Sequence, residues 1–98
     1  MYKTFFLDEV QNDIDIAKKW YSEQQKDLDI KFVIAVKNTI SRILKMPFAY
    51  AVRYRNVRIA HIEIFPYNIH FYIEEEKSQI VIIGIIHNKR KDALYIDK

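Results

Sequence analysis

One run of residues near the C-terminal end contains no polar side chain, and it constrains the fold more than any other feature of the chain. The run covers residues 80–86 and reads Ile-Val-Ile-Ile-Gly-Ile-Ile. An apolar run without alternation is typical of a central β-strand that is covered on both of its faces. The remainder of the chain must therefore supply neighbouring strands and an apolar layer for this segment.

Two segments with alternating polarity precede this run, and each predicts a further strand. Residues 57–65 lead into a turn at Pro66-Tyr67, and residues 68–74 follow that turn. Side chains alternate between the two faces of a sheet, so such segments form half-buried strands. We therefore expect an antiparallel hairpin with Pro66 and Tyr67 as its two central turn residues. In this register Phe65 pairs with Asn68, Glu63 with His70, and His61 with Tyr72.

The first half of the chain has helical periodicity instead. Residues 2–7 form a short aromatic and β-branched segment, which predicts a first strand. Asp8 and Asp27 are candidate N-caps of two helices, and Pro47 ends the second helix. The apolar stripes that identify these helices are Val10, Ile14, Ala17 and Tyr21, then Leu28, Phe32, Ala35, Val36, Ile40 and Ile43.

This order of elements predicts an α+β fold of the type β-α-α-β-β-β. The two helices form a hairpin that packs on one face of a small antiparallel sheet, because only they bring an apolar stripe to the strands. The chain has 98 residues, no repeat and no linker, so we expect one domain over residues 1–98.

The composition excludes several classes of function. Without cysteine the chain has no disulfide, no thiolate zinc site and no cysteine nucleophile. Gly84 is the only glycine, so a phosphate-binding loop or a dinucleotide fingerprint cannot form. The histidines lack a His-x-x-x-His spacing, and we expect neither a metal nor another cofactor. The net charge of +3 permits an acidic partner but does not demand one.

The sequence shows no sign of a membrane segment. No stretch approaches the ~20 apolar residues that a membrane-spanning helix needs. The apolar segment near Met1 is too short for a signal peptide and reaches Asp8 and Glu9 at once. We therefore expect a cytoplasmic protein without membrane contact.

A polar set falls on one face of the predicted hairpin. In the register given above, the outward-facing residues are His61, Glu63, Asn68, His70 and Tyr72. His87 and Arg90, after the apolar strand, could join the rim of this face. Imidazoles exchange protons near neutral pH, arginines bind phosphates, and tyrosine rings stack on bases. The face is either a nucleic-acid-binding or RNA-cleaving surface, or an ordinary solvated sheet face with common cross-strand pairs.

Further basic residues leave the same two interpretations open. The candidate nucleic-acid contacts are Arg53, Arg55, Arg58, Tyr72, Lys89 and Lys91. Three of them, Arg53, Arg55 and Arg58, surround a predicted turn at residues 55–56 and could follow phosphates. In the other interpretation, these arginines form a charged hairpin end, which discourages pairing between the edges of two sheets.

An ordered set of residues along the chain carries a resemblance to a known family. The set is Ala17, Tyr21, Phe32, Leu44-Lys45-Met46-Pro47, Phe65-Pro66-Tyr67 and His87-Asn88-Lys89-Arg90. With these residues the chain resembles the RelE/ParE superfamily of bacterial type II toxin–antitoxin toxins over nearly its whole length. It looks most like the ParE-like branch, in which a strand that ends in His-x-x-Arg is usual.

The resemblance implies a growth-inhibiting toxin of a plasmid stabilisation or addiction module, encoded beside its antitoxin. The cognate antitoxin would cover the toxin with an extended or helical segment, and operator DNA would be contacted only through the antitoxin. RelE-like members cut mRNA on the ribosome, whereas ParE-like members inhibit DNA gyrase. The expected target is therefore either DNA gyrase or the ribosome with its mRNA.

Departures from the RelE-like pattern favour the gyrase-inhibiting branch. RelE-like members carry a basic residue where this chain has Asn68, and lysines where it has Ile59 and His61. A face without these cations would stabilise a scissile phosphate poorly. The alternatives are a ribosome-dependent mRNA endonuclease and a non-toxic RNA- or protein-binding module. If the chain is a nuclease, its catalytic candidates are His61, His70, His87, Arg90 and Tyr95.

The apolar content also predicts a protein partner. Half of the residues are hydrophobic, which is a large share for a chain that can form only a modest core. Some apolar surface should therefore stay uncovered by the fold. An antitoxin segment would cover it, and a homodimer is the other arrangement that we consider.

Overall fold

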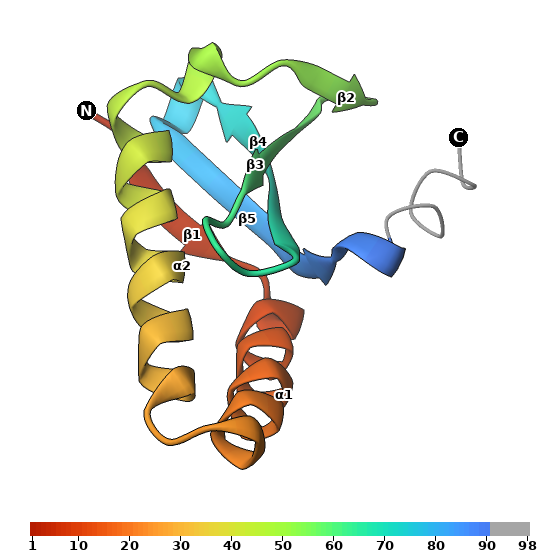
Figure 1. Cartoon of the computed structure of the whole chain (residues 1–98). Coiled ribbons are helices and arrows are strands. Elements are labelled where there is room, and N and C mark those ends of the chain that lie inside the picture. Colours follow the sequence, from red (N-terminus) through yellow and green to blue (C-terminus); the bar gives the residue numbers. More distant parts are fainter. Residues whose placement is uncertain (91–98) are drawn as a thin grey trace.

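The computed structural model of the protein describes residues 1–90 (Figure 1). A hairpin of two helices covers one face of a five-stranded sheet. The helices are α1 (Asp8–Gln24) and α2 (Leu28–Lys45), and the strands are β1 (Lys3–Phe6), β2 (Val52–Tyr54), β3 (Val57–His61), β4 (Tyr67–Glu74) and β5 (Gln79–His87). Three short 3-10 helices are η1 (Pro47–Ala49), η2 (Glu75–Lys77) and η3 (Asn88–Arg90). In this part of the chain no helix is long and apolar enough to cross a membrane.

The strand order is β1-β5-β4-β3-β2, so the segment predicted as a central strand does lie between two partners. The α+β fold and the helical hairpin on one face of the sheet are confirmed. The prediction of an antiparallel sheet is wrong for one pair of strands, because β1 joins β5 in parallel and makes the sheet mixed. One detail goes beyond the prediction, since residues 52–61 form a hairpin of two strands. No tight turn joins β1 to β5, so the connection leaves their relative direction free.

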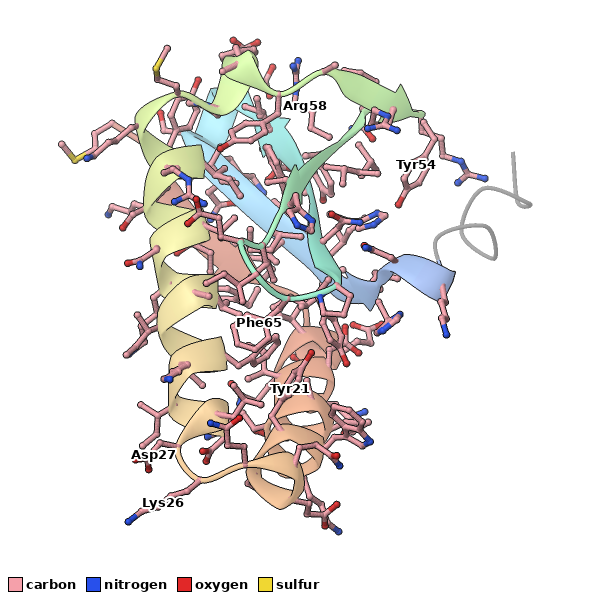
Figure 2. The ribbon with its side chains drawn as sticks, viewed as in Figure 1. Tyr21, Lys26, Asp27, Tyr54, Arg58 and Phe65 are labelled. Atoms are coloured by element: carbon pink, nitrogen blue, oxygen red, sulfur yellow. The ribbon has the colours of Figure 1, made fainter. Side chains whose placement is uncertain are left out.

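The main core lies between the helices and the sheet. The predicted helix stripes are confirmed, since Val10, Ala17 and Tyr21 of α1 and Phe32, Val36 and Ile43 of α2 are buried. The sheet contributes Ile69, Phe71, Ile80, Ile82 and Ile85, which are all fully buried. At one end, Tyr21 packs against Phe65 with ring centroids 5.0 Å apart (Figure 2). Burial of each such large side chain contributes roughly 1.5–3 kcal/mol, so this layer is the main source of stability.

Helix α1 also completes the hydrogen bonding of β5. The ladder between β1 and β5 ends at the pair Phe6 and Ile82. Beyond that point, Asp13 Oδ2 accepts a hydrogen bond from the Ile85 N–H at 3.1 Å. A buried backbone N–H without an acceptor costs free energy, so this carboxylate allows the central strand to extend past its short neighbour.

Of the two predicted N-caps, Asp8 is wrong, whereas Asp27 does occupy the N-cap position of its helix. Helix α1 begins at Asp8 itself, with Leu7 at the N-cap position and no side-chain capping bond. Asp8 instead places negative charge in the first turn, where the helix dipole favours it. Asp27 does precede α2, at the turn between the helices (Figure 2), but it makes no capping bond. Its backbone is left-handed, with φ 67°, rather than in the extended conformation of a typical N-cap.

The predicted register of the hairpin between β3 and β4 is also wrong. His61 pairs with Asn68 and Ile59 pairs with His70, and residues 62–66 form a wider loop. A two-residue hairpin turn needs a positive φ at its first central position, whereas proline is fixed near −65°. The positive φ falls on Ile64 instead, at 78°, and this side chain is 92% exposed.

The other face of the sheet contains a buried polar pair. The Tyr54 hydroxyl and His70 Nδ1 lie 3.0 Å apart, and both side chains are buried. Tyr54 belongs to the edge strand β2 (Figure 2), and its side chain reaches across β3 to His70 in β4. Burial, and secondarily the positive charge of Arg53, lowers the pKa of His70 to about 4. The expectation that His70 faces solvent is therefore wrong, because the Tyr54 side chain covers the His70 ring.

The buried His70 should make stability fall in mild acid. The unfolded chain takes up a proton at the ordinary histidine pKa of 6.5, whereas the native ring stays neutral down to about pH 4. The stability contributed is complete above pH 6.5 and is lost as the pH falls from there to about 4, by up to about 3 kcal/mol. Urea unfolding between pH 4 and 7.5 should show this loss for the natural chain and not for His70→Phe.

The same substitution at an exposed histidine, His61→Phe, serves as the control and should keep the full pH dependence. If His70→Phe does not fold, an NMR titration of the natural chain replaces it, because the pKa of the His70 ring should lie well below the ordinary histidine value of 6.5. An ordinary histidine pKa at His70 would contradict the buried neutral ring.

Candidate functional site

A short polar network crosses the face of the sheet that the helices leave open. His61 Nδ1 lies 3.2 Å from Asn68 Oδ1, and Asn68 Nδ2 donates to Asn88 Oδ1 at 2.8 Å. Because Asn68 donates to Asn88, its oxygen accepts from the His61 Nδ1–H, as assigned from the hydrogen-bond pattern. This tautomer leaves Nε2 of the exposed His61 as a lone-pair acceptor. The arrangement orients one imidazole, and no hydrogen bond within residues 1–90 joins a second proton-transfer group to it.

The other two histidines lie elsewhere. His70 is on the same face as His61 but is fully buried, so solvent does not reach its ring. His87 pairs with Tyr67, the neighbour of Asn68, and alternation therefore places it on the helix-facing side. Its ring packs edge-on against Tyr67 at 5.0 Å, and its Nδ1 accepts a hydrogen bond from the Lys89 N–H at 3.1 Å. The expectation that His87 joins the rim of the polar face is wrong.

Glu63 also leaves the predicted polar set. It lies in the loop at residues 62–66 and lines a cavity beside α2, because the wider loop removes it from the strand. Tyr72 remains in β4 and is half-buried. The predicted face is thus reduced to His61, Asn68 and Tyr72 as solvent-accessible groups among the described residues.

The basic residues divide into structural and exposed ones. The Arg58 guanidinium donates to the Tyr50 carbonyl and lies 5.1 Å from the ring centroid of Phe48. Arg58 therefore ties η1 to β3 through a charge-assisted hydrogen bond and a cation–π contact. Arg53 and Arg55 are exposed on either side of the buried Tyr54. Nothing in the sequence distinguished Arg58 from its neighbours.

The remaining candidates lie at the C-terminal end of the described chain. Lys89 is exposed, and the backbone of Arg90 lies in η3. Lys91 and Tyr95 lie outside the described residues. Within residues 1–90, no three His, Asp or Glu side chains gather closely enough to hold a metal ion.

Three of the cavities in the described part of the chain lie along the helices, and the pattern of polar residues gave no sign of them. The first has a volume of about 370 Å³ and lies between α2 and the loop, with Ile34, Ile64 and Phe65 among its lining. The second, of about 340 Å³, is lined by Ile16, Trp20, Tyr21, Pro66, Tyr67 and His87. The third, of about 230 Å³, runs between the two helices. A sequence signal existed in the unbroken apolar run at residues 32–36, which exceeds the stripe that a helix needs to pack on one sheet.

The chain matches a known family over most of its length. A family model described as the ParE toxin of the type II toxin–antitoxin system parDE matches residues 5–92. Among curated proteins, none matches the sequence.

Solved structures share the fold at low sequence identity. The chromosomal ParDE toxin–antitoxin system from P. aeruginosa aligns with a TM-score of 0.75 and 18% identity, over 89% of this chain and 96% of that one. The intact E. coli RelBE toxin–antitoxin complex aligns with a TM-score of 0.59 and 13% identity, over 89% of this chain and 96% of the matched chain. The isolated E. coli RelE toxin aligns with a TM-score of 0.60 and 13% identity, over 99% of this chain and 95% of the matched chain. Since the family model spans residues 5–92 and the architecture agrees, this chain belongs to the ParE toxin family of type II toxin–antitoxin systems.

Proposed function

We propose that this ParE-family toxin inhibits DNA gyrase by binding to it, without cleaving RNA, and that a cognate antitoxin neutralises it. Gyrase is the target that the resemblance to the ParE-like branch implies. The main support for gyrase binding without RNA cleavage is that the three histidines lie apart from one another. Acid–base catalysis needs its proton-transfer groups within reach of one reacting site.

The three histidines differ both in their position and in their chemical surroundings. His61 is exposed and bonded to Asn68, whereas His70 is buried and neutral. His87 lies across the sheet, in a cavity with α1 residues. No described part of the chain brings two of these rings to a shared surface position.

The exposed side chains also suit a protein partner. Trp20 is 54% exposed, Ile34 is 52% exposed and Ile64 is 92% exposed. Apolar groups gathered beside cavities mark protein–protein contact surfaces more often than nucleic-acid contacts. Ile64 has a positive φ, a backbone conformation that β-branched residues rarely adopt because it is strained. The loop therefore holds the Ile64 side chain in solvent at a conformational cost.

The gyrase proposal predicts the outcome of a supercoiling assay. The purified chain should inhibit ATP-dependent supercoiling of relaxed plasmid by gyrase, and prior addition of the antitoxin should restore it. In parallel, primer extension on a defined mRNA in a purified translation system should show an intact message. Codon-aligned cuts that need ribosomes, together with unaffected gyrase, would reject the proposal in favour of an mRNA endonuclease.

A single substitution separates the two modes in cells. His61→Ala should leave growth inhibition within about two-fold of the natural chain at equal expression, because binding does not need an exposed base. In a nuclease that used His61 for proton transfer, the loss would reach about 100-fold or more. Growth after induction, with protein levels measured by immunoblot, provides the comparison. Loss of toxicity with a normal level of folded protein would point to catalysis at His61.

A further inference from the structure

The loop at residues 62–66 fixes one apolar side chain in solvent. Ile62 and Phe65 are buried, whereas Ile64 between them is 92% exposed. Backbone hydrogen bonds close the loop, since the Ile62 N–H donates to the Tyr67 carbonyl at 3.0 Å and the Tyr67 N–H donates to the Phe65 carbonyl at 2.8 Å. The φ of 78° at Ile64 is strained for a β-branched residue. Strain of this kind clusters at functional sites, so the outward position of Ile64 indicates contact with another molecule.

An apolar cavity lies directly beside this side chain, between α2 and the loop, and we call it the loop cavity. It has a volume of about 370 Å³, and its apolar lining is Leu28, Ile34, Ala35, Ile64 and Phe65. Part of this lining faces solvent, because Ile34 is 52% exposed. The same surface of the molecule therefore carries both an apolar projection and an apolar recess.

The polar lining of the loop cavity is complementary to itself. It consists of Lys31, Asn38 and Glu63, which supply one positive charge, one negative charge and a neutral amide. A strongly acidic or basic partner would meet a like charge at one of the two ionic residues. A two-fold axis brings the same surface of two chains together, so each Lys31 can face a Glu63. By contrast, the cavity between the helices is lined by Lys18 and Lys37 without a carboxylate, and would repel a copy of itself.

We propose that the loop cavity is the contact surface of a two-fold symmetric homodimer. The Ile64 side chain of each copy enters the loop cavity of the other, and Lys31 of each copy pairs with Glu63 of the other. Burial of Ile64 and Ile34 supplies the apolar contact, and the two ion pairs fix the relative orientation of the copies. Because the loop already fixes Ile64 in the free chain, its docking costs little conformational entropy. This dimer requires neither gyrase nor an antitoxin.

Sedimentation equilibrium of the purified full chain tests the dimer and the role of Ile64. The mass should rise with concentration towards that of two chains, and Ile64→Asn should weaken self-association by about ten-fold or more. The same variant should raise the urea midpoint of the monomer, because asparagine adopts a positive φ with less strain. Ile16→Asn is the matched control, since Ile16 is 61% exposed on α1 and does not line the loop cavity. It should change the Kd of the dimer by less than about two-fold.

Charge-reversal variants test whether Lys31 and Glu63 meet across two copies. Lys31→Glu and Glu63→Lys should each weaken self-association by about ten-fold, because each homodimer would then hold two contacts between like charges. An equal mixture of the two variants should associate within about three-fold of the natural chain, because both contacts in the mixed dimer join opposite charges. Lys45→Glu and Glu76→Lys make the same charge changes outside the loop cavity. These two variants should self-associate like the natural chain, whether alone or mixed.

Several results would overturn a homodimer at the loop cavity. A chain that stays monomeric up to about 1 mM would exclude a second copy as the occupant. If Ile64→Asn then weakened binding of the antitoxin or of gyrase, the loop cavity would receive that protein instead. A dimer that tolerates Ile64→Asn, or whose two charge variants do not rescue each other, would place the contact elsewhere. Failure of gyrase inhibition would leave these association results in place, so the two proposals fail separately.

Discussion

The burial of β5 is the constraint on which the rest of the structure depends. Ile80, Ile82 and Ile85 are fully buried, and Val81 on the opposite face is 2% exposed. A strand without polar side chains needs a strand on each side and cover above and below it. β1 and β4 supply the neighbours, and the helical hairpin supplies one cover. Where β1 ends, the Asp13 carboxylate takes its place as a hydrogen-bond acceptor for Ile85.

This arrangement gives the two faces of the sheet different roles. The helix-covered face holds the aromatic cluster around Tyr21 and Phe65 and leaves cavities along the helices. The open face is polar, but its central histidine is withdrawn from solvent by Tyr54. Among the described residues of this face, His61 is the one histidine that stays accessible, and Asn68 orients its ring. The proposal of a binding role rests on this arrangement, because acid–base chemistry needs a converging set of groups.

A toxin of a toxin–antitoxin system that contacts other proteins needs apolar surface beyond its own core. In a chain of 98 residues with half of them hydrophobic, the helices provide this surplus. The left-handed Ile64 and the apolar run in α2 both display side chains that the fold itself does not bury. The cavity between α2 and the loop includes Ile34 and Ile64, and the cavity between the two helices includes Val33 and Val36.

The sequence by itself determined the element order, the helix stripes and the central strand, because hydrophobic periodicity reports the face that each element buries. It did not determine the hairpin register, since the two-residue turn proposed at Pro66 conflicts with the fixed φ of proline and the chain forms a wider loop. It also could not show that Tyr54 covers His70, or that Arg58 is bound to Tyr50, because these contacts join residues from different strands and loops. Only the tertiary structure decided which polar residues reach solvent: burial depends on what lies above a residue, and local sequence does not contain that information.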